Sequence, residues 1–328
     1  MAYIYPFPSQ LPSPSNDLPA TLMSLEECSL VNIDGEDARK YLQGQLTCDL
    51  DTLTDSTHTF AAHCDPKGKV WSNLVLFCQK NSLAYIERSS VCEQQVAELK
   101  KYAVFSKLTI SREQNQVLLG LAGHNARETL ALIYQSLPNE QTPVVQHKHA
   151  TLLYFPAPTE RFLIIATANE AEAIFTQLLG KVALNNCAQW QALDIEAGYP
   201  ILEAQNSEQF LPQSLNLQAL NSISFTKGCY SGQEMVARAK YRGANKYAMY
   251  WLSGKAPFRL PEPGEKLELQ LGENWRQTGT ILTAVKLVNE TVWVQAILSN
   301  DLAEDAILRL RDDHETLTIQ SLPYSLTE

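Results

Sequence analysis

The chain has 328 residues, of which 45% are hydrophobic and 19% are charged, and its net charge is −10. This composition predicts a soluble globular protein of about two or three domains. The acidic balance argues against a dedicated nonspecific nucleic-acid binder, because lysine and arginine dominate phosphate binding. No apolar run reaches the length of a membrane span and the N-terminus has no signal-peptide pattern, so we expect a cytoplasmic protein.

The sequence up to residue 180 alternates predicted strands and helices after a proline-rich start, residues 1–18, which we expect to be an extended, partly mobile arm. Hydrophobic alternation predicts strands at residues 29–33, 59–64, 70–77, 83–86, 104–110, 117–122 and 162–166. Helical periodicity predicts helices at residues 36–50, 90–104, 125–137 and 170–179. Ser90, with Glu93 three residues later, would cap the second helix. The turn signal Asp65-Pro66-Lys67-Gly68 predicts a hairpin.

Beyond residue 183 the pattern changes twice. Residues 183–226 show no regular pattern, and we interpret them as an irregular, site-forming region. Past residue 245, which we take as a domain boundary, short strands are predicted at residues 247–252, 266–271, 279–285, 291–296 and 307–310. That spacing indicates a small β-barrel or sandwich.

The most distinctive motif is Lys227-Gly228-Cys229-Tyr230-Ser231-Gly232-Gln233-Glu234. Ser231 and Glu234 have the spacing of a capping box, which predicts a helix that begins just after the cysteine. The N–H groups of that helix end and the ammonium group of Lys227 would both favour a Cys229 thiolate. The alternative is a tight turn around an inert small residue.

The seven cysteines are scattered along the chain and, without a secretion signal, predict reduced thiols. Cys48, Cys64, Cys78 and Cys92 recur at similar intervals, but no Cys-x-x-Cys pair and no Cys/His pair of metal-ligand spacing accompanies them. None of the six histidines has the spacing of a metal site or a catalytic triad. We therefore expect no stably bound metal.

A basic, aromatic segment follows the motif. No acidic residue occurs between Met235 and Pro261. Basic residues recur there at Arg238, Lys240, Arg242, Lys246, Lys255 and Arg259, with Tyr241, Tyr247, Tyr250 and Trp251 between them. This segment is either an anion-binding surface or a solvated helix end whose cations complement the helix dipole.

Several stretches together resemble the YgfZ family of folate-binding, tRNA-modifying proteins, which is related to the aminomethyltransferase (T-protein) of the glycine cleavage system. The cysteine motif carries the resemblance most specifically. Further matching stretches are Tyr41-Leu42-Gln43-Gly44-Gln45, Cys64-Asp65-Pro66-Lys67-Gly68-Lys69, Leu99-Lys100-Lys101-Tyr102 and Ile195-Glu196-Ala197-Gly198. The resemblance covers almost the whole chain.

The resemblance implies an α+β fold arranged as a three-domain cloverleaf. The first α+β domain would comprise residues 1–50 and 117–245, and a second α+β domain, residues 51–116, would be inserted in it. These two domains would enclose a central folate channel. Residues 246–328 would form the C-terminal β-barrel, which agrees with the strand pattern.

The resemblance also implies a folate site. Glu196 stands where the T-protein has a carboxylate, and a carboxylate accepts the paired N–H groups of a pterin in a fork. Trp190 matches a family tryptophan used in folate binding, whereas Cys28 stands where a second such tryptophan would be, so one wall of the site would differ. The anionic glutamate tail of folate would meet a basic residue, and the sequence does not choose among Arg238, Lys240, Arg242, Lys100 and Lys101.

Ser72 and Asn73 stand where the T-protein carries its acidic pair. A neutral amide cannot act as a general base near neutral pH, so T-protein-type aminomethyl transfer is not expected and the chain is not a classical enzyme on this interpretation. Asp65 is interpreted as a turn residue. Cys229 then remains the reactive candidate, tuned by Lys227, and Glu234 is assigned to capping.

The favoured hypothesis is a protein that binds tetrahydrofolate or another reduced folate. Through transient contact it would support iron–sulfur enzymes and thereby the thiomethylation of tRNA, with no membrane contact and no strong direct binding of nucleic acid. The first alternative is a folate-dependent one-carbon transferase or demethylase. The second is a direct RNA-binding module that uses the basic residues of segment 238–259.

Overall fold

The computed structural model describes residues 5–80, 82–303, 305–311 and 313–326. The chain divides into two compact units. The first unit comprises Met1–Leu42, Leu50–Thr59 and Leu74–Leu193, and the second comprises Gln43–Asp49, Phe60–Asn73 and Asp194–Glu328. The division into three domains expected from the resemblance stays a prediction.

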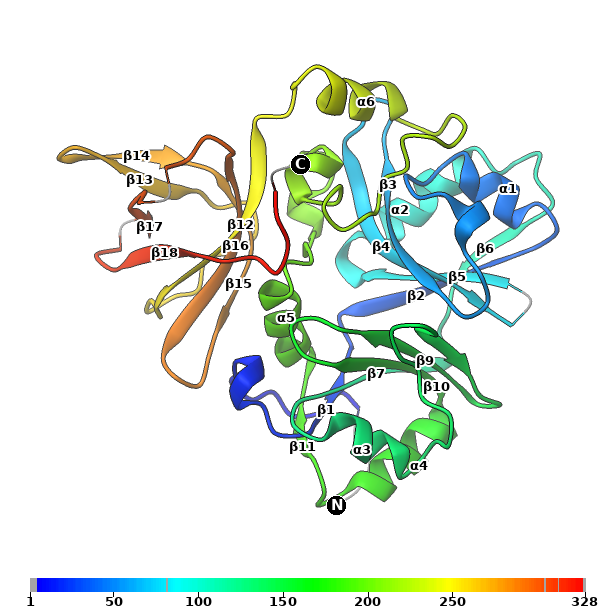
Figure 1. The fold of residues 1–328 in the computed structure, drawn as a ribbon. Helices are drawn as coiled ribbons and strands as arrows, with labels where there is room; N and C mark the ends of the chain where they lie inside the picture. The colour runs from blue at the N-terminus through cyan, green and yellow to red at the C-terminus, as the bar shows by residue number, and fades with distance from the viewer. Residues whose placement is uncertain (1–4, 81, 304, 312, 327–328) are drawn as a thin grey trace. The chain divides into compact units, whose positions relative to one another are not determined.

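The first unit contains a six-stranded sheet with the strand order β11-β1-β7-β10-β9-β8. Its strands are β1 (Thr21–Ser24), β7 (Gln116–Ala122), β8 (Val144–Gln146), β9 (Ala150–Phe155), β10 (Arg161–Thr167) and β11 (Ala183–Asn185). Helices α3 (Ala126–Ala131) and α4 (Ala168–Leu178) lie against one face of this sheet (Figure 1). The Thr167 hydroxyl oxygen accepts the N–H of Glu170 at 3.3 Å and so caps α4.

The N-terminal arm packs against this unit. Phe7 is 3% exposed and belongs to the hydrophobic core that lies between the sheet and its helices. The N–H groups of Gln10 and Ser13 donate to the side chains of Asn185 and Gln189, both at 2.9 Å. The expectation of a partly mobile arm is therefore wrong for these residues, because a buried aromatic side chain and two hydrogen bonds to side-chain amides hold them in place.

A five-stranded sheet has the order β3-β4-β5-β2-β6. Its strands are β2 (Cys28–Asp34), β3 (His58–Cys64), β4 (Val70–Gln79), β5 (Ser82–Arg88) and β6 (Thr109–Arg112). Strands β3 and β4 each start in one unit and end in the other. The nearby helices are α1 (Ala38–Gln43), shorter than predicted and followed by a 3-10 turn at Leu50–Thr52, and α2 (Ser89–Lys101). Helix α2 begins at Ser89 with Arg88 as its N-cap residue, so the predicted Ser90 cap is wrong because Ser90 already lies within the helix.

The second unit ends in a seven-stranded antiparallel sheet with the order β14-β13-β17-β18-β12-β16-β15. Its strands are β12 (Tyr247–Lys255), β13 (Leu267–Leu271), β14 (Asn274–Thr278), β15 (Thr280–Lys286), β16 (Thr291–Ser299), β17 (Leu308–Leu310) and β18 (Thr316–Gln320). Leucine, isoleucine and valine side chains on its inner face form one buried cluster. The predicted barrel-type strands are confirmed, and with the two sheets above they confirm the α+β class.

The segment interpreted as irregular contains a helix, α5 (Cys187–Glu196), and two short 3-10 turns at Ala204–Asn206 and Pro212–Leu215. The interpretation was wrong for α5 because buried side chains occur around most of this helix, so that no amphipathic stripe marks it. Helix α6 (Gln233–Tyr241) follows the cysteine motif as predicted. In the part of the chain that is described, no helix is long and apolar enough to span a bilayer.

Candidate functional site

The cysteine motif lies in a loop that leads into α6, and its cysteine is exposed. The helix begins after Gly232, whose φ of 78° is left-handed. The Ser231 hydroxyl donates to the Cys64 carbonyl at 3.0 Å, and Glu234 pairs with Arg238 at 2.6 Å. No side chain among the described residues caps this end. The predicted capping box, including the assignment of Glu234, is therefore wrong, because a glycine occupies the cap position.

Two glycines allow α6 to approach the hairpin turn between β3 and β4. A Cβ atom on Gly232 would lie 2.5 Å from the Asp65 carbonyl oxygen, and one on Gly68 would lie 2.9 Å from the Met235 Cβ. Both glycines have positive φ. The Asp65 carboxylate accepts the N–H of Lys69 at 2.7 Å, so its interpretation as a turn residue is confirmed. The turn and the start of α6 therefore form one closely packed structure.

Lys227 ties the motif to residues 43–49 of the same unit. Its ammonium group donates to the carbonyl oxygens of Leu46 at 2.8 Å and Cys48 at 2.6 Å. The ammonium nitrogen also lies 5.2 Å from the ring centroid of Tyr230. The tuning of Cys229 by this lysine stays a prediction. Its two bonds to backbone carbonyls also fix the loop.

Thr47 completes this attachment. Its hydroxyl donates to the Ser222 carbonyl at 2.7 Å and accepts the N–H of Ala62 at 2.8 Å. Its backbone N–H donates to the Ala62 carbonyl at 3.0 Å, and its carbonyl accepts the N–H of Ser224 at 2.8 Å. One fully buried residue therefore joins β3 to the chain just before the motif. Sequence reasoning missed Thr47 because these partners are distant in sequence.

The three thiols of the second unit differ in environment. Cys229 is exposed, whereas Cys48 and Cys64 are buried. Burial raises the pKa of Cys48 to about 12, although the nearby Lys227 opposes the shift. Burial also raises the pKa of Cys64. Solvent contact makes Cys229 the thiol of this unit that is available for reaction.

Tyr230 stands beside the exposed cysteine in sequence, but its side chain is buried. Burial raises the pKa of its phenol, and the nearby Cys64 adds to the shift. Its hydroxyl is buried and has no hydrogen-bond partner among the described residues. The motif therefore presents its thiol to solvent while its aromatic ring anchors the loop.

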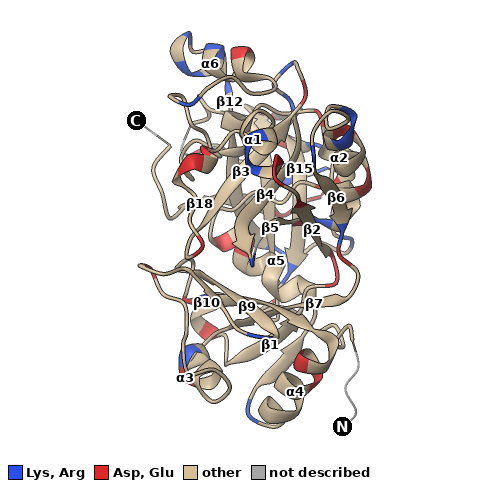
Figure 2. Cartoon of the chain, turned by 90° about the vertical axis from the view of Figure 1, so that its right-hand side faces the viewer, with Lys and Arg blue, Asp and Glu red and all other residues tan. Residues whose placement is uncertain are grey.

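The basic segment is partly neutralised by carboxylates. Figure 2 shows basic residues along α6. The described ion pairs join Arg238 to Glu234 at 2.6 Å, Lys255 to Glu315 at 2.8 Å and Arg259 to Glu265 at 2.7 Å. The Lys240 ammonium lies 4.2 Å from the ring centroid of Phe225. For part of the segment, these contacts favour solvated, structurally paired cations over an anion-binding surface, since paired cations attract phosphate less strongly.

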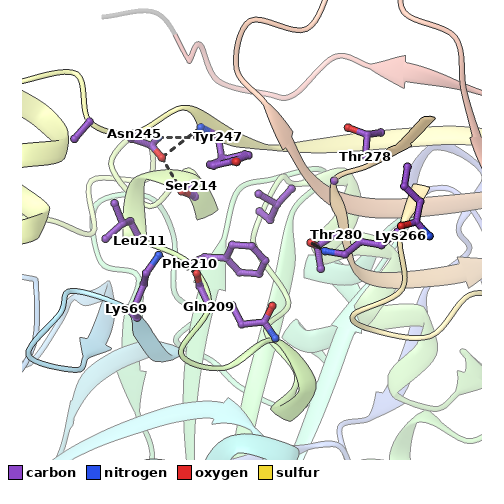
Figure 3. Close-up of a pocket in the computed structure, with 14 residues that line it drawn as sticks. Lys69, Gln209, Phe210, Leu211, Ser214, Asn245, Tyr247, Lys266, Thr278 and Thr280 are labelled. Carbon is purple, nitrogen blue, oxygen red and sulfur yellow. Dashed lines mark hydrogen bonds between the residues drawn. The ribbon is translucent and has the colours of Figure 1, made fainter. Parts of the chain in front are cut away.

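A cavity of about 570 Å³ opens in the second unit beside the seven-stranded sheet (Figure 3). Lys69 and Lys266 supply two ammonium groups, which donate to the Gln209 carbonyl at 3.0 Å and to the Thr280 hydroxyl at 2.6 Å. Phe210 adds an aromatic surface, and no aspartate or glutamate is among its described lining residues. Such a cavity suits an anion with an apolar part. Sequence reasoning missed it because the two lysines lie far apart in the chain.

Trp190 is a buried residue of the first unit, with 5% of its surface exposed. The Arg161 guanidinium lies 4.5 Å from the indole centroid, and Phe155 packs edge-on at 6.1 Å. Gly120 on β7 leaves room for the indole, because a Cβ atom there would lie 2.6 Å from the Trp190 Cε3 atom. These are the surroundings of a core tryptophan. Stacking of a ligand on the indole face would require Arg161 to move.

The other predicted folate residues lie in different elements. Glu196 is the last residue of α5, is half-buried and belongs to the second unit. Cys28 begins β2 in the first unit and is half-buried. Lys100 and Lys101 lie in the last turn of α2, where Lys101 pairs with Glu98 at 2.5 Å. The predicted grouping of these residues around one ligand stays a prediction.

Ser72 and Asn73 are both buried on β4. The Asn73 amide donates to the Pro200 carbonyl at 2.8 Å, and the Ser72 hydroxyl donates to the Asn73 carbonyl at 3.2 Å. The positions matched to the acidic pair of the T-protein therefore carry neutral groups that bond to the backbone. Neither group can serve as a general base near neutral pH.

Comparison with known proteins places this architecture in a family. The tRNA-modifying protein YgfZ of Yersinia pseudotuberculosis is 56% identical over 329 residues, which cover 100% of this chain and 99% of that protein. The protein of the same name from Yersinia enterocolitica matches with the same identity and coverage. The sequence model described as "YgfZ, beta-barrel domain" matches residues 245–313.

Among solved structures, the glycine cleavage system aminomethyltransferase T of Bartonella henselae superposes with a TM-score of 0.72. The match has 17% sequence identity and covers 94% of this chain and 87% of that one. The likeness establishes a common fold. Together with the full-length identity to the Yersinia proteins, it shows that the chain belongs to the YgfZ family.

Proposed function

We propose that this protein binds a reduced folate in the cytoplasm and supports iron–sulfur enzymes that modify tRNA, with Cys229 as its reactive thiol. The observation that carries the proposal is the full-length identity to proteins named tRNA-modifying protein YgfZ. The partners would be a tetrahydrofolate and, transiently, the enzymes themselves. A stable metal site and strong direct binding of nucleic acid are not part of the proposal.

The chemistry of the residues supports folate binding unequally. The Glu196 carboxylate at the end of α5 fits the donor edge of a pterin, because its two oxygens accept two parallel N–H bonds. Trp190 fits less well as a stacking surface, since Arg161 already covers its ring. We therefore assign the main polar recognition to Glu196 and an apolar, supporting contact to Trp190.

The T-protein reaction is not part of the proposed function. Ser72 and Asn73 are buried and bond to backbone carbonyls, so no carboxylate at these positions can accept a proton from an attacking nitrogen. A bound reduced folate would supply the one-carbon chemistry. In this chain the residue left to react is the exposed Cys229 thiol, at the end of a loop held by Lys227.

Folate binding is tested by titrating the full-length protein with tetrahydrofolate under anaerobic conditions and measuring heat. We expect binding, and we expect Glu196→Gln to weaken it by about 10- to 100-fold, because a charge-assisted fork contributes about 1.5–3 kcal/mol. Glu273→Gln, at an exposed residue of the turn between β13 and β14, is the matched control. A folded wild-type protein that binds no reduced folate would refute the proposal.

The role of Cys229 is tested separately. In cells that lack the native gene, Cys229→Ser should lower tRNA thiomethylation several-fold while the purified variant keeps its folate affinity and unfolding temperature. Cys92→Ser, a buried thiol of the first unit, is the control for loss of a cysteine. Unchanged thiomethylation in the Cys229 variant would remove the thiol from the proposed function and leave folate binding standing.

A further inference from the structure

Two cysteines of the first unit meet at the start of α5. Cys187 is the first residue of that helix, and Cys28 is the first residue of β2. The thiols of these residues are hydrogen-bonded to each other, which raises the pKa of Cys187 well above its ordinary value. Two thiols within hydrogen-bond reach of each other, on segments distant in sequence, are candidates for a disulfide.

A basic side chain and a carboxylate frame the two thiols. Arg88 lies directly opposite Cys28 in the β2–β5 ladder, and its guanidinium donates to the Cys187 sulfur at 3.6 Å. The same guanidinium pairs with Glu27 at 2.6 Å, which fixes its orientation. The Glu26 carboxylate accepts the N–H of Cys187 at 3.4 Å. The positive charge of Arg88 lowers the pKa of Cys187, in opposition to the hydrogen bond with Cys28 and to burial, which raise it.

The two thiols differ in access to solvent. Cys28 is half-buried and lines a surface hollow of about 340 Å³, whose wall also contains Arg112 and Glu113. Cys187 is 1% exposed. In such an arrangement the accessible thiol, here Cys28, is oxidised first to a sulfenic acid. The covered thiol, here Cys187, then attacks the sulfenic acid to form a disulfide.

We propose that Cys28 and Cys187 are a redox-active pair that forms a reversible disulfide when the protein meets hydrogen peroxide. The Cys28 sulfur attacks one peroxide oxygen, the O–O bond breaks, and the departing hydroxide takes up the proton of the Cys28 thiol and leaves as water. The Cys187 sulfur then attacks the resulting sulfenic acid, the S–S bond forms, and the displaced hydroxide takes up the Cys187 proton to give a second water. A dithiol reductant reverses the change and is itself oxidised to a disulfide.

The disulfide would bind the first turn of α5 to β2 covalently. Trp190 lies one turn after Cys187 and is the tryptophan of the first unit, so its fluorescence is a convenient reporter. Formation of this disulfide does not require folate, because the two thiols and Arg88 belong to one unit and no ligand takes part in the reaction.

The test uses the full-length, reduced protein. It is exposed to hydrogen peroxide at a small molar excess, its remaining thiols are blocked with N-ethylmaleimide, and its peptides are mapped by mass spectrometry without reduction. We expect a linked peptide pair that contains Cys28 and Cys187, lighter than the sum by two hydrogen atoms, and its loss after treatment with a dithiol. Intrinsic tryptophan fluorescence, to which Trp190 contributes, should change with the same time course.

The variants separate this pair from general thiol oxidation. Cys28→Ser and Cys187→Ser should each abolish the linked peptide and the fluorescence change. Cys78→Ser is the matched control, because Cys78 is a buried cysteine of the same unit that also accepts from an arginine, Arg39, at 3.6 Å. A wild-type protein in which both thiols stay open to N-ethylmaleimide, or in which Cys28 oxidises without any link to Cys187, would overturn the proposal.

Discussion

Single side chains that bond to backbone carbonyls hold the loop before α6. Lys227 makes two such bonds and Thr47 makes one, and all of the carbonyls belong to the second unit. A bond of this kind contributes about 1 kcal/mol net, and more when the donor is charged. The lysine of the cysteine motif therefore has a structural task that is separate from any effect on the neighbouring thiol.

Buried histidines make the folded protein sensitive to acid. His63 is completely enclosed, and burial lowers its pKa to about 4 from an ordinary 6.5. Burial also lowers the pKa of His58, although its bond to the Tyr154 carbonyl opposes the shift. The unfolded chain therefore binds protons that the folded chain does not, and stability is lost as the pH falls from 6.5 towards 4.

We expect His63 alone to remove about 3 kcal/mol of unfolding free energy between pH 7 and pH 4, since one unit of pKa shift corresponds to about 1.4 kcal/mol. The measurement is urea unfolding of the wild type and of His63→Gln at a series of pH values. The difference between the two proteins should shrink as the pH falls through this window. A constant difference would contradict the expectation and assign the acid sensitivity to other groups.

At the scale of elements, the start of α6 depends on a glycine that no other residue can replace without strain. Gly232→Ala should lower the unfolding free energy by about 2 kcal/mol or more, because its φ is left-handed and the new Cβ would meet the Asp65 carbonyl oxygen. Thermal or urea unfolding measures this loss. The loop should also open, which faster alkylation of the Cys64 thiol would report.

Variants of two further glycines in this region separate dihedral strain from steric contact. Gly243 has a positive φ of 59°, and an added Cβ would meet open space. Gly243→Ala should therefore lower the unfolding free energy only by the dihedral strain, about 1 kcal/mol. Gly228→Ala also meets nothing within 4 Å, and we expect little change in stability. Equal losses in all three variants would show that close packing of the turn against α6 contributes nothing.

Most strands could be predicted from their hydrophobic pattern, whereas helix α5 could not. Strand β4 and the strands past residue 245 have hydrophobic residues in the patterns that sheets bury, and turn residues bound them. Helix α5 is buried around most of its circumference, so it has no stripe with a helical period. The capping prediction for α6 failed because the Ser231 hydroxyl found a partner in the Cys64 carbonyl, a contact that local spacing cannot indicate.

The candidate site shows the same limit. The motif singled out Cys229 as the reactive candidate, and the structure shows it exposed, whereas the attachment of Lys227 to residues 46 and 48 depends on tertiary structure. The contact between Cys28 and Cys187 could not be predicted either, because it depends on where α5 starts. Sequence patterns identify the chemistry of a single residue better than they identify the residues that it contacts in the folded protein.

At the scale of the whole molecule, the C-terminal segment returns to the middle of the second unit. The Tyr324 hydroxyl donates to the Gly198 carbonyl at 2.6 Å and accepts from the Asn216 amide at 3.3 Å. Burial raises the pKa of this tyrosine to about 12. One phenol therefore joins the chain end to the residues after α5 and to the 3-10 turn region.

Tyr324→Phe should lower the unfolding free energy by about 1–2 kcal/mol, because it leaves a carbonyl and an amide without this partner. Tyr102→Phe, at a residue that is 62% exposed, should be neutral and serves as the control. Differential scanning calorimetry compares the two variants with the wild type. Faster hydrogen exchange in residues 198–216 should accompany the loss, and unchanged exchange would show that the chain end is held by other contacts.

The route of the chain through its two units has a consequence for how such a gene can change. The chain passes from one unit to the other after Leu42, Asp49, Thr59, Asn73 and Leu193. Four of these points lie within α1, β3, β4 and α5, and Asp49 directly precedes the 3-10 turn at Leu50–Thr52. A single recombination event between two diverged relatives therefore cannot exchange one unit without also exchanging part of the other. A crossover near residue 60 divides both units, whereas one near residue 245 leaves the first unit intact, so chimaeras of distant relatives should tolerate the second crossover better.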